Sequence, residues 1–585
     1  MQLVVTRRNR SQPAPAPPPG VNPVLWQAYW TRGVRDANDL VLSLDRLTPV
    51  GTLEGIAAAS EILIAHRERK ILVVGDFDAD GATSTALIVR CLRAFGFANV
   101  DFLVPNRFEY GYGLTPEIVA LAAGREPSLI VTVDNGISSV AGVAAARALG
   151  IDVLVTDHHL PGAELPAANV IVNPNVPGSQ FASRALAGVG VAFYVMAALR
   201  RELDVRGQIQ AGAPSPAEWL DLVALGTVAD LVPLDTNNRV LVSQGLQRIR
   251  AGRCVPGISA LLEFAKRSRL SITAADLGFA VGPRLNAAGR LDDMTIGIRC
   301  LLADSMVDAT ALAARLDQLN LERRAIEARM QAEAMAAVKH LRTSVALTDA
   351  TGPERSGVCL FDESWHQGVV GLVAGRIKDQ LRRPVFAFAR AGEGELRGSG
   401  RSVAGIHIRD VLDRVATANP GLLDRFGGHA MAAGLSLAEH LLDDFARAFD
   451  AEVRRSSDPN KRANGIETDG ELGPTEIALA TAHALRAGGP WGQAFPEPSF
   501  DGVFAIKSAR RIGDRHLKLW VETAARERAF DAVAFNYFDP TEPQAPPAGE
   551  VRLVYRLDVN EYQGERRLQL IVDHVLPVDA AAGVR

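Results

Sequence analysis

The 585-residue sequence has few cysteines, no long apolar run and little net charge. The four cysteines, Cys91, Cys254, Cys300 and Cys359, are scattered without CxxC spacing, so the sequence implies neither a disulfide framework nor a thiolate zinc site. The longest apolar runs, such as Leu129 to Val133, are as long as a strand and far shorter than the ~20 residues of a membrane helix. We therefore expect a protein that crosses no membrane.

The net charge of the whole chain is −4. So small a charge gives no general attraction to phosphate backbones, and any affinity for nucleic acid must come from local clusters of Lys and Arg. The N-terminus, Met1 to Arg8, lacks the apolar core and cleavage site of a secretory signal. We expect a cytoplasmic protein.

The composition is that of a folded protein with several domains. Hydrophobic residues make up 48% of the chain and charged residues 22%, which is ordinary globular usage. At roughly 100 to 200 residues per domain, the length corresponds to about three to five domains. Ser11 to Gly20 contains five prolines and is expected to be an extended lead-in.

Strands and helices alternate in the first third of the chain. Ile71 to Val74 predicts a strand, and after a turn the periodic Ala82 to Phe95 predicts a helix that ends at Gly96. Further strands are expected at residues 99–104, 129–133, 152–155 and 170–172. This alternation is typical of a parallel sheet with both faces covered by helices.

The rest of the chain divides into three kinds of segment. Residues 189–203, 216–229 and 238–251 are periodic and predict helices. Residues 309–339 contain no Gly or Pro and predict one connecting helix, about 45 Å long at 1.5 Å per residue. A second α/β region at 358–453 and a polar linker, Ser456 to Gly465, precede short strands that predict a small β-barrel.

Acidic and imidazole side chains follow the predicted strands where these end. They are Asp76, Asp78, Asp80, Asp134, Asp157, His158, His159 and Asp230, the last at the end of an apolar helix. Asp76, Asp78 and Asp80 alternate, so in an extended segment they project to one side. Because parallel strands end at the same edge of a sheet, we expect the whole set to gather there.

A single Asp after a strand is most often a turn former or a helix N-cap. Six acids close together are different, because their mutual repulsion favours protonation unless a cation lies among them. Oxygen and imidazole ligands without cysteine suit Mg²⁺ or Mn²⁺ better than structural zinc. Bridging carboxylates favour two ions about 3.5 to 4 Å apart, so the spacing predicts metal-dependent hydrolysis of a phosphoester or phosphoanhydride.

Four segments resemble the phosphoesterase motifs of the DHH family. They are VVGDFDADGATSTA at 73–86, VTVDNG at 131–136, VTDHH at 155–159 and GTVAD at 226–230. Further segments narrow the resemblance to a branch of the family that degrades single-stranded DNA, and they lie at 104–113, 186–193, 283–290, 365–371, 398–402 and 426–434. The similarity covers nearly everything from about residue 51 onward.

The resemblance implies an α/β fold with a parallel-sheet DHH domain, a long connecting helix, a smaller DHHA1-like α/β domain and a C-terminal OB-fold barrel. The expected boundaries are a partly disordered N-terminal extension at 1–50, the DHH catalytic domain at 51–305, the connecting helix at 306–345, the DHHA1-like domain at 346–455 and the single-strand-binding OB-fold at 466–585.

The resemblance also implies two metal ions, Mg²⁺ or Mn²⁺, that activate water against phosphorus. The ligands it implies are Asp78, Asp80, Asp134, His158 and Asp230, with Asp134 as the bridge. The residues left to orient ligands or transfer protons are Asp76, Asp157 and His159. His159 is expected to act as a general acid or phosphate contact, with a buried packing role as the alternative.

Other residues are implied in binding DNA. Ser399 and Arg401, in a Gly-rich turn, suit a terminal phosphate, with Arg107 and Arg284 beside them. For His366 and His429 two interpretations remain open. Each either contributes to the site or is an interior histidine with a packing role.

The predicted barrel has a basic segment in which a single acid, Asp514, faces five cations. The cations are Lys507, Arg510, Arg511, Arg515 and Lys518. Trp520 follows, and basic groups beside an aromatic ring fit a single-strand groove. The alternative is an ordinary charged face of a barrel.

The function expected from the resemblance is processive 5′→3′ degradation of single-stranded DNA to 5′-mononucleotides in repair and recombination. We expect a monomer that cooperates with a single-strand-binding protein and a helicase. One alternative is a DHH-family phosphodiesterase or pyrophosphatase acting on short oligonucleotides or small phosphates. The other is a non-catalytic DNA-binding scaffold of the same fold.

Overall fold

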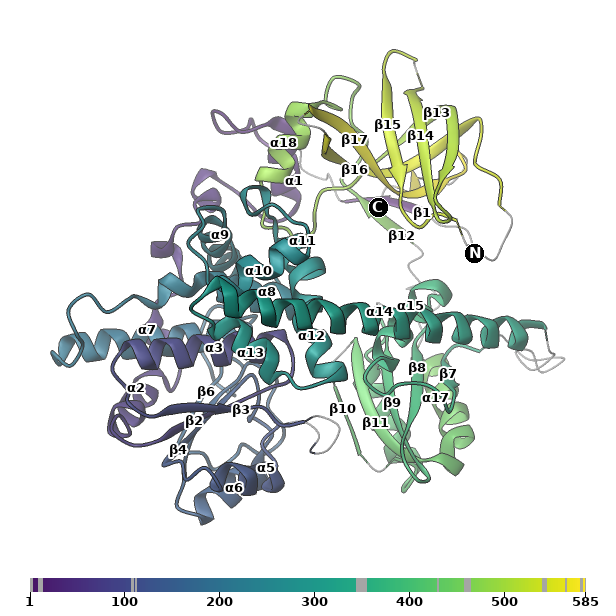
Figure 1. Cartoon of the computed structure of the whole chain (residues 1–585). Helices are drawn as coiled ribbons and strands as arrows, with labels where there is room; N and C mark the ends of the chain where they lie inside the picture. Colours follow the sequence, from purple (N-terminus) through teal and green to yellow (C-terminus); the bar gives the residue numbers. More distant parts are fainter. Residues whose placement is uncertain are drawn as a thin grey trace. The chain divides into compact units, whose positions relative to one another are not determined.

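The computed structural model describes residues 4–8, 14–106, 110, 113–343, 355–403, 405–423, 425–428, 431–456, 465–524, 526–538, 544–562, 565–578 and 582–583. The chain forms two compact units (Figure 1). The first unit comprises Met1–Gly289, Asp293–Leu316 and Asn464–Arg585, and the second comprises Arg290–Asp292 and Asp317–Ala463.

The first unit contains the predicted parallel sheet. Its strand order is β3 (Val100–Leu103), β2 (Ile71–Gly75), β4 (Leu129–Val133), β5 (Asp152–Thr156) and β6 (Val170–Val172). All four pairings are parallel. β2 and β4 are buried along their whole length, as expected for apolar strands covered on both faces.

Helices cover both faces of this sheet (Figure 1). One face packs on α5 (Pro116–Ala123) and α6 (Val140–Ala148) through an apolar cluster that includes Ile130 and Val143. On the other side α3 (Ala79–Ala94) packs on α7 (Gly188–Val205) and α8 (Leu220–Ala229). The predicted helix at 216–229 is divided, because its first turn is the 3₁₀ helix η4 (Pro216–Trp219), capped by Ser215.

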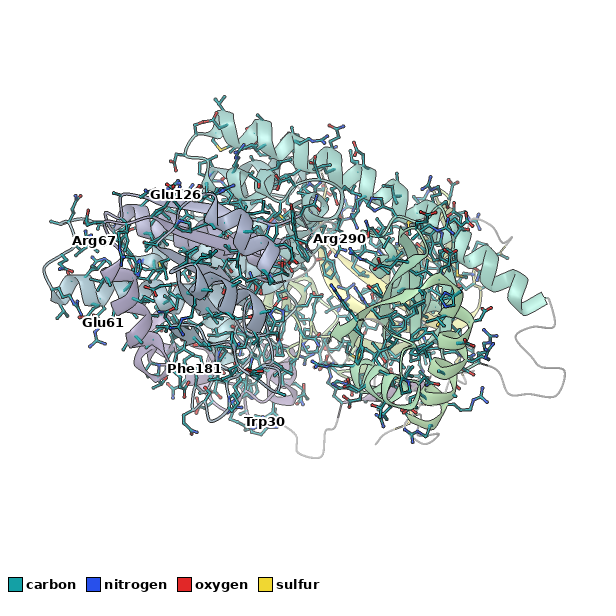
Figure 2. The ribbon with its side chains drawn as sticks, turned by 90° about the horizontal axis from the view of Figure 1, so that it is seen from below. Trp30, Glu61, Arg67, Glu126, Phe181 and Arg290 are labelled. Carbon is teal, nitrogen blue, oxygen red and sulfur yellow. The ribbon has the colours of Figure 1, made fainter. Side chains whose placement is uncertain are left out.

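The first unit contains further helices. They are α1 (Pro23–Thr31), η1 (Ala37–Leu40), η2 (Leu44–Arg46), η3 (Val50–Thr52), α2 (Ile56–Ala65), α9 (Thr236–Arg250), α10 (Pro256–Phe264), η5 (Arg269–Ser271), α11 (Ala274–Asp276), the π-helical turn η6 (Leu277–Val281), α12 (Gly282–Leu291), α13 (Thr295–Leu302) and α18 (Leu479–Ala487). Of these, α18 packs on strand β16 (Glu550–Tyr562) of the barrel, α1 packs on α18, and α12 ends in the first residues of the second unit. Phe181, labelled in Figure 2, is fully buried. Its ring packs edge to face against that of Tyr194.

The predicted connecting helix is α14 (Met306–Thr343). Its 38 residues correspond to about 57 Å at 1.5 Å per residue, somewhat more than the predicted length. The chain passes from the first unit to the second within this helix, after Leu316.

The second unit is built on a mixed sheet. Its strand order is β10 (Arg425–Gly428), β11 (Ala432–Ala438), β9 (Glu395–Arg401), β8 (Val385–Gly392) and β7 (Val358–Phe361). Its other helices are α15 (Val370–Leu381), α16 (Ile408–Ala418), η7 (Glu439–Leu441) and α17 (Leu442–Ser456). Two apolar clusters cover the sheet, one with α15 and one with α16 and α17.

The C-terminal strands close into the predicted barrel. Around it run β13 (Phe500–Ile512), β14 (His516–Thr523), β15 (Ala529–Ala534), β17 (Glu565–Leu576) and β16 (Glu550–Tyr562). The pairing of β15 with β17 is parallel, and the other pairings given by the register are antiparallel.

The N-terminal residues differ from the expected extension. β1 (Val4–Arg7) lies between β12 (Gly465–Thr468) and β18 (Ala582–Gly583), parallel to both. Arg7 donates to Asp501 at 2.8 Å, and Tyr29 of α1 donates to the carbonyl of Gly488. Trp30, labelled in Figure 2, carries the guanidinium of Arg35 on its ring. No local sequence signal predicts these contacts to Asp501 and Gly488, because the partners lie more than 400 residues away.

The sequence implies no disulfide framework and predicts no membrane-spanning helix. All four cysteines are free thiols. Among the described helices, no single one is long and apolar enough to cross a membrane. The pair Leu44–Thr52 and Ile56–Ala65 meets that criterion only together, and it is bent by 77°.

Candidate active site

The three acids after β2 do not lie in an extended segment, contrary to the prediction. Asp78 is the N-cap of α3, and its Oδ1 accepts hydrogen bonds from the amides of Asp80 and Gly81 at 2.9 and 3.0 Å. The helix therefore begins between the acids and places Asp80 in its first turn. As a result Asp76 and Asp78 approach Asp134, whereas Asp80 approaches His158 and Asp230.

Asp80 is fully buried at the N-terminus of α7. Its Oδ2 accepts a hydrogen bond from the amide of Gly188 at 2.6 Å, and its Oδ1 accepts one from Val189 at 2.9 Å. A Cβ on Gly188 would lie 2.8 Å from Cβ of Asp134, and one on Gly226 would lie 2.8 Å from Oδ1 of Asp80. Both glycines are therefore required for the close approach of the helices to the acids.

His158 lies among three carboxylates. Its Nε2 is 3.1 Å from Oδ1 of Asp134, 3.5 Å from Oδ2 of Asp230 and 4.0 Å from Oδ2 of Asp80. Asp134 follows β4 in the left-handed region, with φ of 60°. The ends of β4 and β5, the first turn of α3 and the end of α8 thus meet at one point, as the sequence predicts.

Asp157 orients His159. Its Oδ1 lies 2.7 Å from Nδ1 of His159. The same oxygen accepts hydrogen bonds from the backbone amides of His158 and His159, and Oδ2 accepts one from the amide of Ile137. Burial alone would lower the pKa of His159, but the hydrogen bond and charge of Asp157 raise this pKa to about 8. Burial alone would raise the pKa of Asp157. The hydrogen bond and the charge of His159 outweigh burial, so the pKa of Asp157 is lowered.

The other acids destabilise one another in their ionised form. Burial raises the pKa of Asp80 to about 7, with a further contribution from the charge of Asp78. Burial, followed by the charges of Asp80 and Asp78, also raises the pKa of Asp134 and of Asp230. Bound cations would remove this repulsion.

The donor set suits hard divalent ions. Three groups have ligand atoms within 4.8 Å of one another: Asp134, His158 and His159; Asp80, His158 and Asp230; and Asp76, Asp78 and Asp134. Asp134 and His158 each belong to two of the groups, so a shared ligand is available for a pair of ions. Carboxylate oxygens with imidazole and no thiolate are typical of Mg²⁺ and Mn²⁺ sites.

Asparagines that the sequence analysis did not single out support this site. The side-chain amides of Asn175 and Asn173 donate to the carbonyls of His158 and His159, at 2.6 and 2.9 Å. Oδ1 of Asn286, on α12, accepts the amide of Ala79 at 2.8 Å. A sequence signal was available, because Asn286 lies within the segment 283–290 that carries the family resemblance.

Of the two arginines predicted beside the terminal phosphate, Arg107 and Arg284, only Arg284 is among the described residues. Arg284 donates to the carbonyls of Ala280 and Phe264. Its helix packs on the Asp-rich turn, since a Cβ on Gly289 would lie 1.8 Å from the carbonyl oxygen of Phe77. Arg107 lies outside the described residues, as does His429 of the second unit.

Ser399 and Arg401 lie in strand β9 and not in a turn as predicted. The two glycines that alternate with them, Gly398 and Gly400, are explained by packing. A Cβ on Gly398 would lie 2.4 Å from the ring of Phe388, and one on Gly400 would lie 2.4 Å from the ring of Phe386. Alternation then leaves Ser399 and Arg401 together on the opposite face, where Nη1 of Arg401 donates to Oγ of Ser399 at 3.1 Å. Nδ1 of His366 accepts the amide of Gly368, a local turn contact.

Two of the five cations in the basic segment of the barrel form ion pairs with acids of the barrel. Lys507 pairs with Glu522 at 3.2 Å and Lys518 pairs with Asp531, and both acids come from neighbouring strands. The guanidinium of Arg511 lies 4.1 Å from the ring centre of Phe538. Trp520 is 47% exposed.

The outward face of β13 and β14 still combines cations with this aromatic ring. The register sets Ser508 opposite Trp520 and Arg510 opposite Lys518. Arg510 and Arg515 are exposed, and neither has an ion-pair partner among the described residues.

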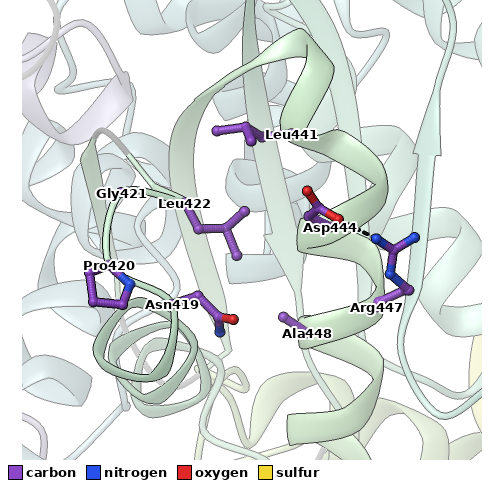
Figure 3. Close-up of a pocket in the computed structure, with 8 residues that line it drawn as sticks. All are labelled: Asn419, Pro420, Gly421, Leu422, Leu441, Asp444, Arg447 and Ala448. Carbon is purple, nitrogen blue, oxygen red and sulfur yellow. Dashed lines mark hydrogen bonds and ion pairs between the residues drawn. The ribbon is translucent and has the colours of Figure 1, made fainter.

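A separate hollow in the second unit lies between the end of α16 and α17 (Figure 3). It has a volume of about 600 Å³, and two of its lining residues, Asp444 and Arg447, form an ion pair. Its lining consists of Asn419, Pro420, Gly421, Leu422, Leu441, Asp444, Arg447 and Ala448. None of these is a predicted site residue.

Three family models match the chain. The N-terminal domain of the DHH family matches residues 70–227, the DHHA1 domain matches residues 354–455, and the RecJ OB domain matches residues 468–574. Together with the parallel sheet and the closed barrel, these matches confirm the predicted fold class.

Curated relatives match nearly the whole chain. The single-stranded-DNA-specific exonuclease RecJ of Dickeya dadantii is 52% identical over 583 residues, which cover 99% of this chain and 100% of the relative. RecJ of Escherichia coli is 51% identical over 582 residues, again covering 99% and 100%.

Solved structures show the same similarity. RecJ from Thermus thermophilus in complex with Mn²⁺ has a TM-score of 0.77 and 32% identity, covering 96% of this chain and 77% of that chain. The Mg²⁺ complex of RecJ from the same organism has a TM-score of 0.72 and 30% identity, covering 96% and 76%.

Proposed function

The chain belongs to the RecJ family of DHH phosphoesterases, and on this premise we propose a metal-dependent exonuclease that releases 5′-mononucleotides from the 5′ end of single-stranded DNA. The observation that carries the proposal is the convergence of Asp80, Asp134 and Asp230 within 4.0 Å of Nε2 of His158. Strand direction, product and a role in repair and recombination rest on the family resemblance.

We propose that two ions, Mg²⁺ or Mn²⁺, are held by Asp78, Asp80, Asp134, His158 and Asp230, with Asp134 shared. When bound, such ions stabilise charge on phosphoryl oxygens and lower the pKa of water. Asp76 and His159 also offer ligand atoms, so the division between ligands and supporting residues is less sharp than the resemblance implies. The amides of Gly188 and Val189 keep the Asp80 carboxylate fixed.

His159 is proposed to act on the leaving group. Oδ1 of Asp157 accepts a hydrogen bond from Nδ1–H of His159 at 2.7 Å. Nε2 is then the ring nitrogen that faces the substrate. A proton at Nε2 would then pass to the leaving 3′-oxygen as the linkage breaks. Its side chain is 25% exposed, which leaves it accessible.

Ser399 and Arg401 are proposed to recognise the terminal 5′-phosphate, assisted by Arg107, Arg284 and His429. Support comes from the adjacent guanidinium and hydroxyl on one face of β9. The exposed face of β13 and β14 is proposed to hold the single strand, with Trp520 stacking on a base and Lys507, Arg510, Arg511, Arg515 and Lys518 near phosphates.

Two alternatives explain less of the chain. A pyrophosphatase or short-oligonucleotide phosphodiesterase gives the barrel and the 38-residue α14 no task. A non-catalytic scaffold has no need of buried acids that raise one another's pKa. Cooperation with a single-strand-binding protein and a helicase, a monomeric state and a cytoplasmic location stay predictions.

The decisive experiment identifies the first product. Full-length protein with Mn²⁺ is given 5′-labelled single-stranded and blunt double-stranded DNA of the same sequence. We expect a labelled mononucleotide as the earliest product, from the single strand alone. Labelled fragments several nucleotides long, or equal release from the duplex, would contradict the proposal, and binding without any product would indicate a scaffold.

A further inference from the structure

Two large apolar side chains are exposed beside Asp230. Leu231 follows it directly, in the left-handed region with φ of 60°, and is 67% exposed. Phe279 is 78% exposed and lies in the π-helical turn η6. A Cβ on the neighbouring Gly278 would lie 3.1 Å from Cγ1 of Val228, so η6 packs on the last turn of α8. Leu231 and Phe279 therefore lie on two segments that adjoin the end of α8, where Asp230 is the C-cap.

Packing does not explain these positions. A phenylalanine ring stabilises a fold when it is buried, and at 78% exposure it contributes little. Single exposed apolar residues are common on surfaces, but here two lie on adjoining segments at the end of α8, the helix whose C-cap is Asp230. π-helical turns are rare, and they occur frequently at functional sites. The same turn also supplies the carbonyl of Ala280 that accepts from Arg284.

The ligand chemistry follows from the exposed ring. An aromatic ring carries no positive charge to attract a phosphate. Its flat face can instead stack on another flat aromatic face. A single strand offers unpaired nucleobases, each with such a face, next to the linkage to be cut. Resting on the proposed function, we propose that Phe279, together with Leu231, forms a platform on which a nucleobase near the scissile linkage stacks.

This platform accepts only an unpaired base. In a duplex each base is already paired and stacked on both neighbours, so presenting it to Phe279 requires disruption of the duplex. Stacking also tolerates every base, because all four have an aromatic face. The platform therefore favours single strands without selecting a sequence.

The test compares normal strands with strands that lack single bases. Full-length wild-type protein and Phe279→Ala receive 5′-phosphorylated single strands with Mn²⁺, each carrying one abasic residue at positions one to four. The rate of first-product release is measured at subsaturating strand. For the wild type we expect a loss of roughly fivefold or more at one of these positions. Phe279→Ala should lose about as much on the normal strand and nothing further at that position.

Two other variants control the comparison. Phe279→Tyr retains a stacking face and should restore most of the rate and the abasic effect. Val205→Ala removes an apolar side chain that is 76% exposed at the far end of α7, about 25 Å along the helix from Gly188, and should match the wild type. Because Phe279 is so exposed, its replacement should leave the melting temperature unchanged.

The outcomes separate the platform from the proposed function. If the wild type and Phe279→Ala lose equally at every abasic position, the platform is wrong while the exonuclease assignment stands. The platform is equally wrong if Phe279→Ala cuts the normal strand as fast as the wild type. If the wild type releases no mononucleotide from any strand, the proposed function itself fails.

Discussion

The amide of Gly188 donates a 2.6 Å hydrogen bond to Oδ2 of Asp80, across 108 residues of sequence. The adjacent amide of Val189 satisfies the other oxygen of the same carboxylate. The positive end of the α7 dipole thus faces an acid whose pKa is raised by burial and then by the charge of Asp78, and the two amide hydrogen bonds oppose this rise. The geometry of the acidic cluster therefore depends on the start of a helix distant in sequence.

Replacing Gly188 with alanine is expected to disrupt this arrangement. The new Cβ would lie 2.8 Å from Cβ of Asp134 and 3.0 Å from Oδ2 of Asp80, so one of the acids must move. A displacement of this size should lower kcat by about 100-fold. Gly124→Ala is the matched control, because its Cβ meets nothing closer than 3.5 Å. Single-turnover rates and binding of labelled strands distinguish damage to the site from loss of affinity.

Asp134→Asn is expected to abolish hydrolysis while single strands still bind. The change removes a carboxylate shared by two ligand groups and leaves the barrel intact. We expect a rate loss of about a thousandfold or more, since the ions supply several kcal/mol and each factor of ten corresponds to about 1.4 kcal/mol. Turnover close to that of the wild type would remove Asp134 from the metal site.

Removal of metal should make stability fall as pH rises. The pKa values of Asp80, Asp134 and Asp230 are raised by folding, with that of Asp80 at about 7. The folded state then binds more protons than the unfolded state between the usual aspartate pKa of about 3.9 and the raised values. Melting temperatures in chelator should therefore decrease from about pH 4 to about pH 7.

Added Mn²⁺ should flatten this pH dependence. Asp221, buried elsewhere in the first unit with a pKa raised to about 6, contributes in the same direction with or without metal. Asp134→Asn is the control that isolates the cluster, and in chelator it should be more stable than the wild type at neutral pH. An identical profile for the two proteins would mean that the cluster carries no such repulsion.

Trp520→Ala should weaken binding of single strands by roughly fivefold or more, because the ring is exposed between cations on the barrel. The rate at saturating strand should change little. Arg567→Ala, on β17 and paired with Glu565, provides a control on a different strand of the barrel. Titrations at several salt concentrations measure the effect, and equal affinities would reduce the basic segment to an ordinary charged surface.

Arg401→Ala should reduce the preference for a 5′-phosphate over a 5′-hydroxyl end. A charge-assisted contact to phosphate is lost, so we expect the ratio of kcat/KM values for the two ends to fall by about tenfold. Arg414→Ala should preserve the ratio, because this arginine of α16 pairs with Glu452 of α17. An unchanged ratio in Arg401→Ala would place the phosphate site elsewhere.

Sequence reasoning succeeded where a local pattern has one physical outcome. The buried strands Ile71–Gly75 and Leu129–Val133 and the acids that follow them were predictable, because a parallel sheet gathers its carboxyl ends at one edge. It failed where packing between distant segments decides. Gly398 and Gly400 looked like turn residues, but they make room for two phenylalanine rings within a strand.

Contacts between distant segments also decide which charged side chains are paired. Lys507 and Lys518 looked unopposed because their partners, Glu522 and Asp531, come from strands later in the chain. The exposed ring of Phe279 carries no sequence signal, since exposure is a property of the folded surface.

The pairing of β1 with β12 has a consequence for synthesis on the ribosome. Arg8 meets Glu467 across 459 residues, and at roughly 5 to 20 residues per second translation of that stretch takes on the order of 20 to 90 s. For that interval a nascent chain carries its first strand without the partner it has when complete, and an unpaired strand edge invites association with other chains. A tag or an altered start site at the front of the gene would therefore act on a domain encoded at its other end.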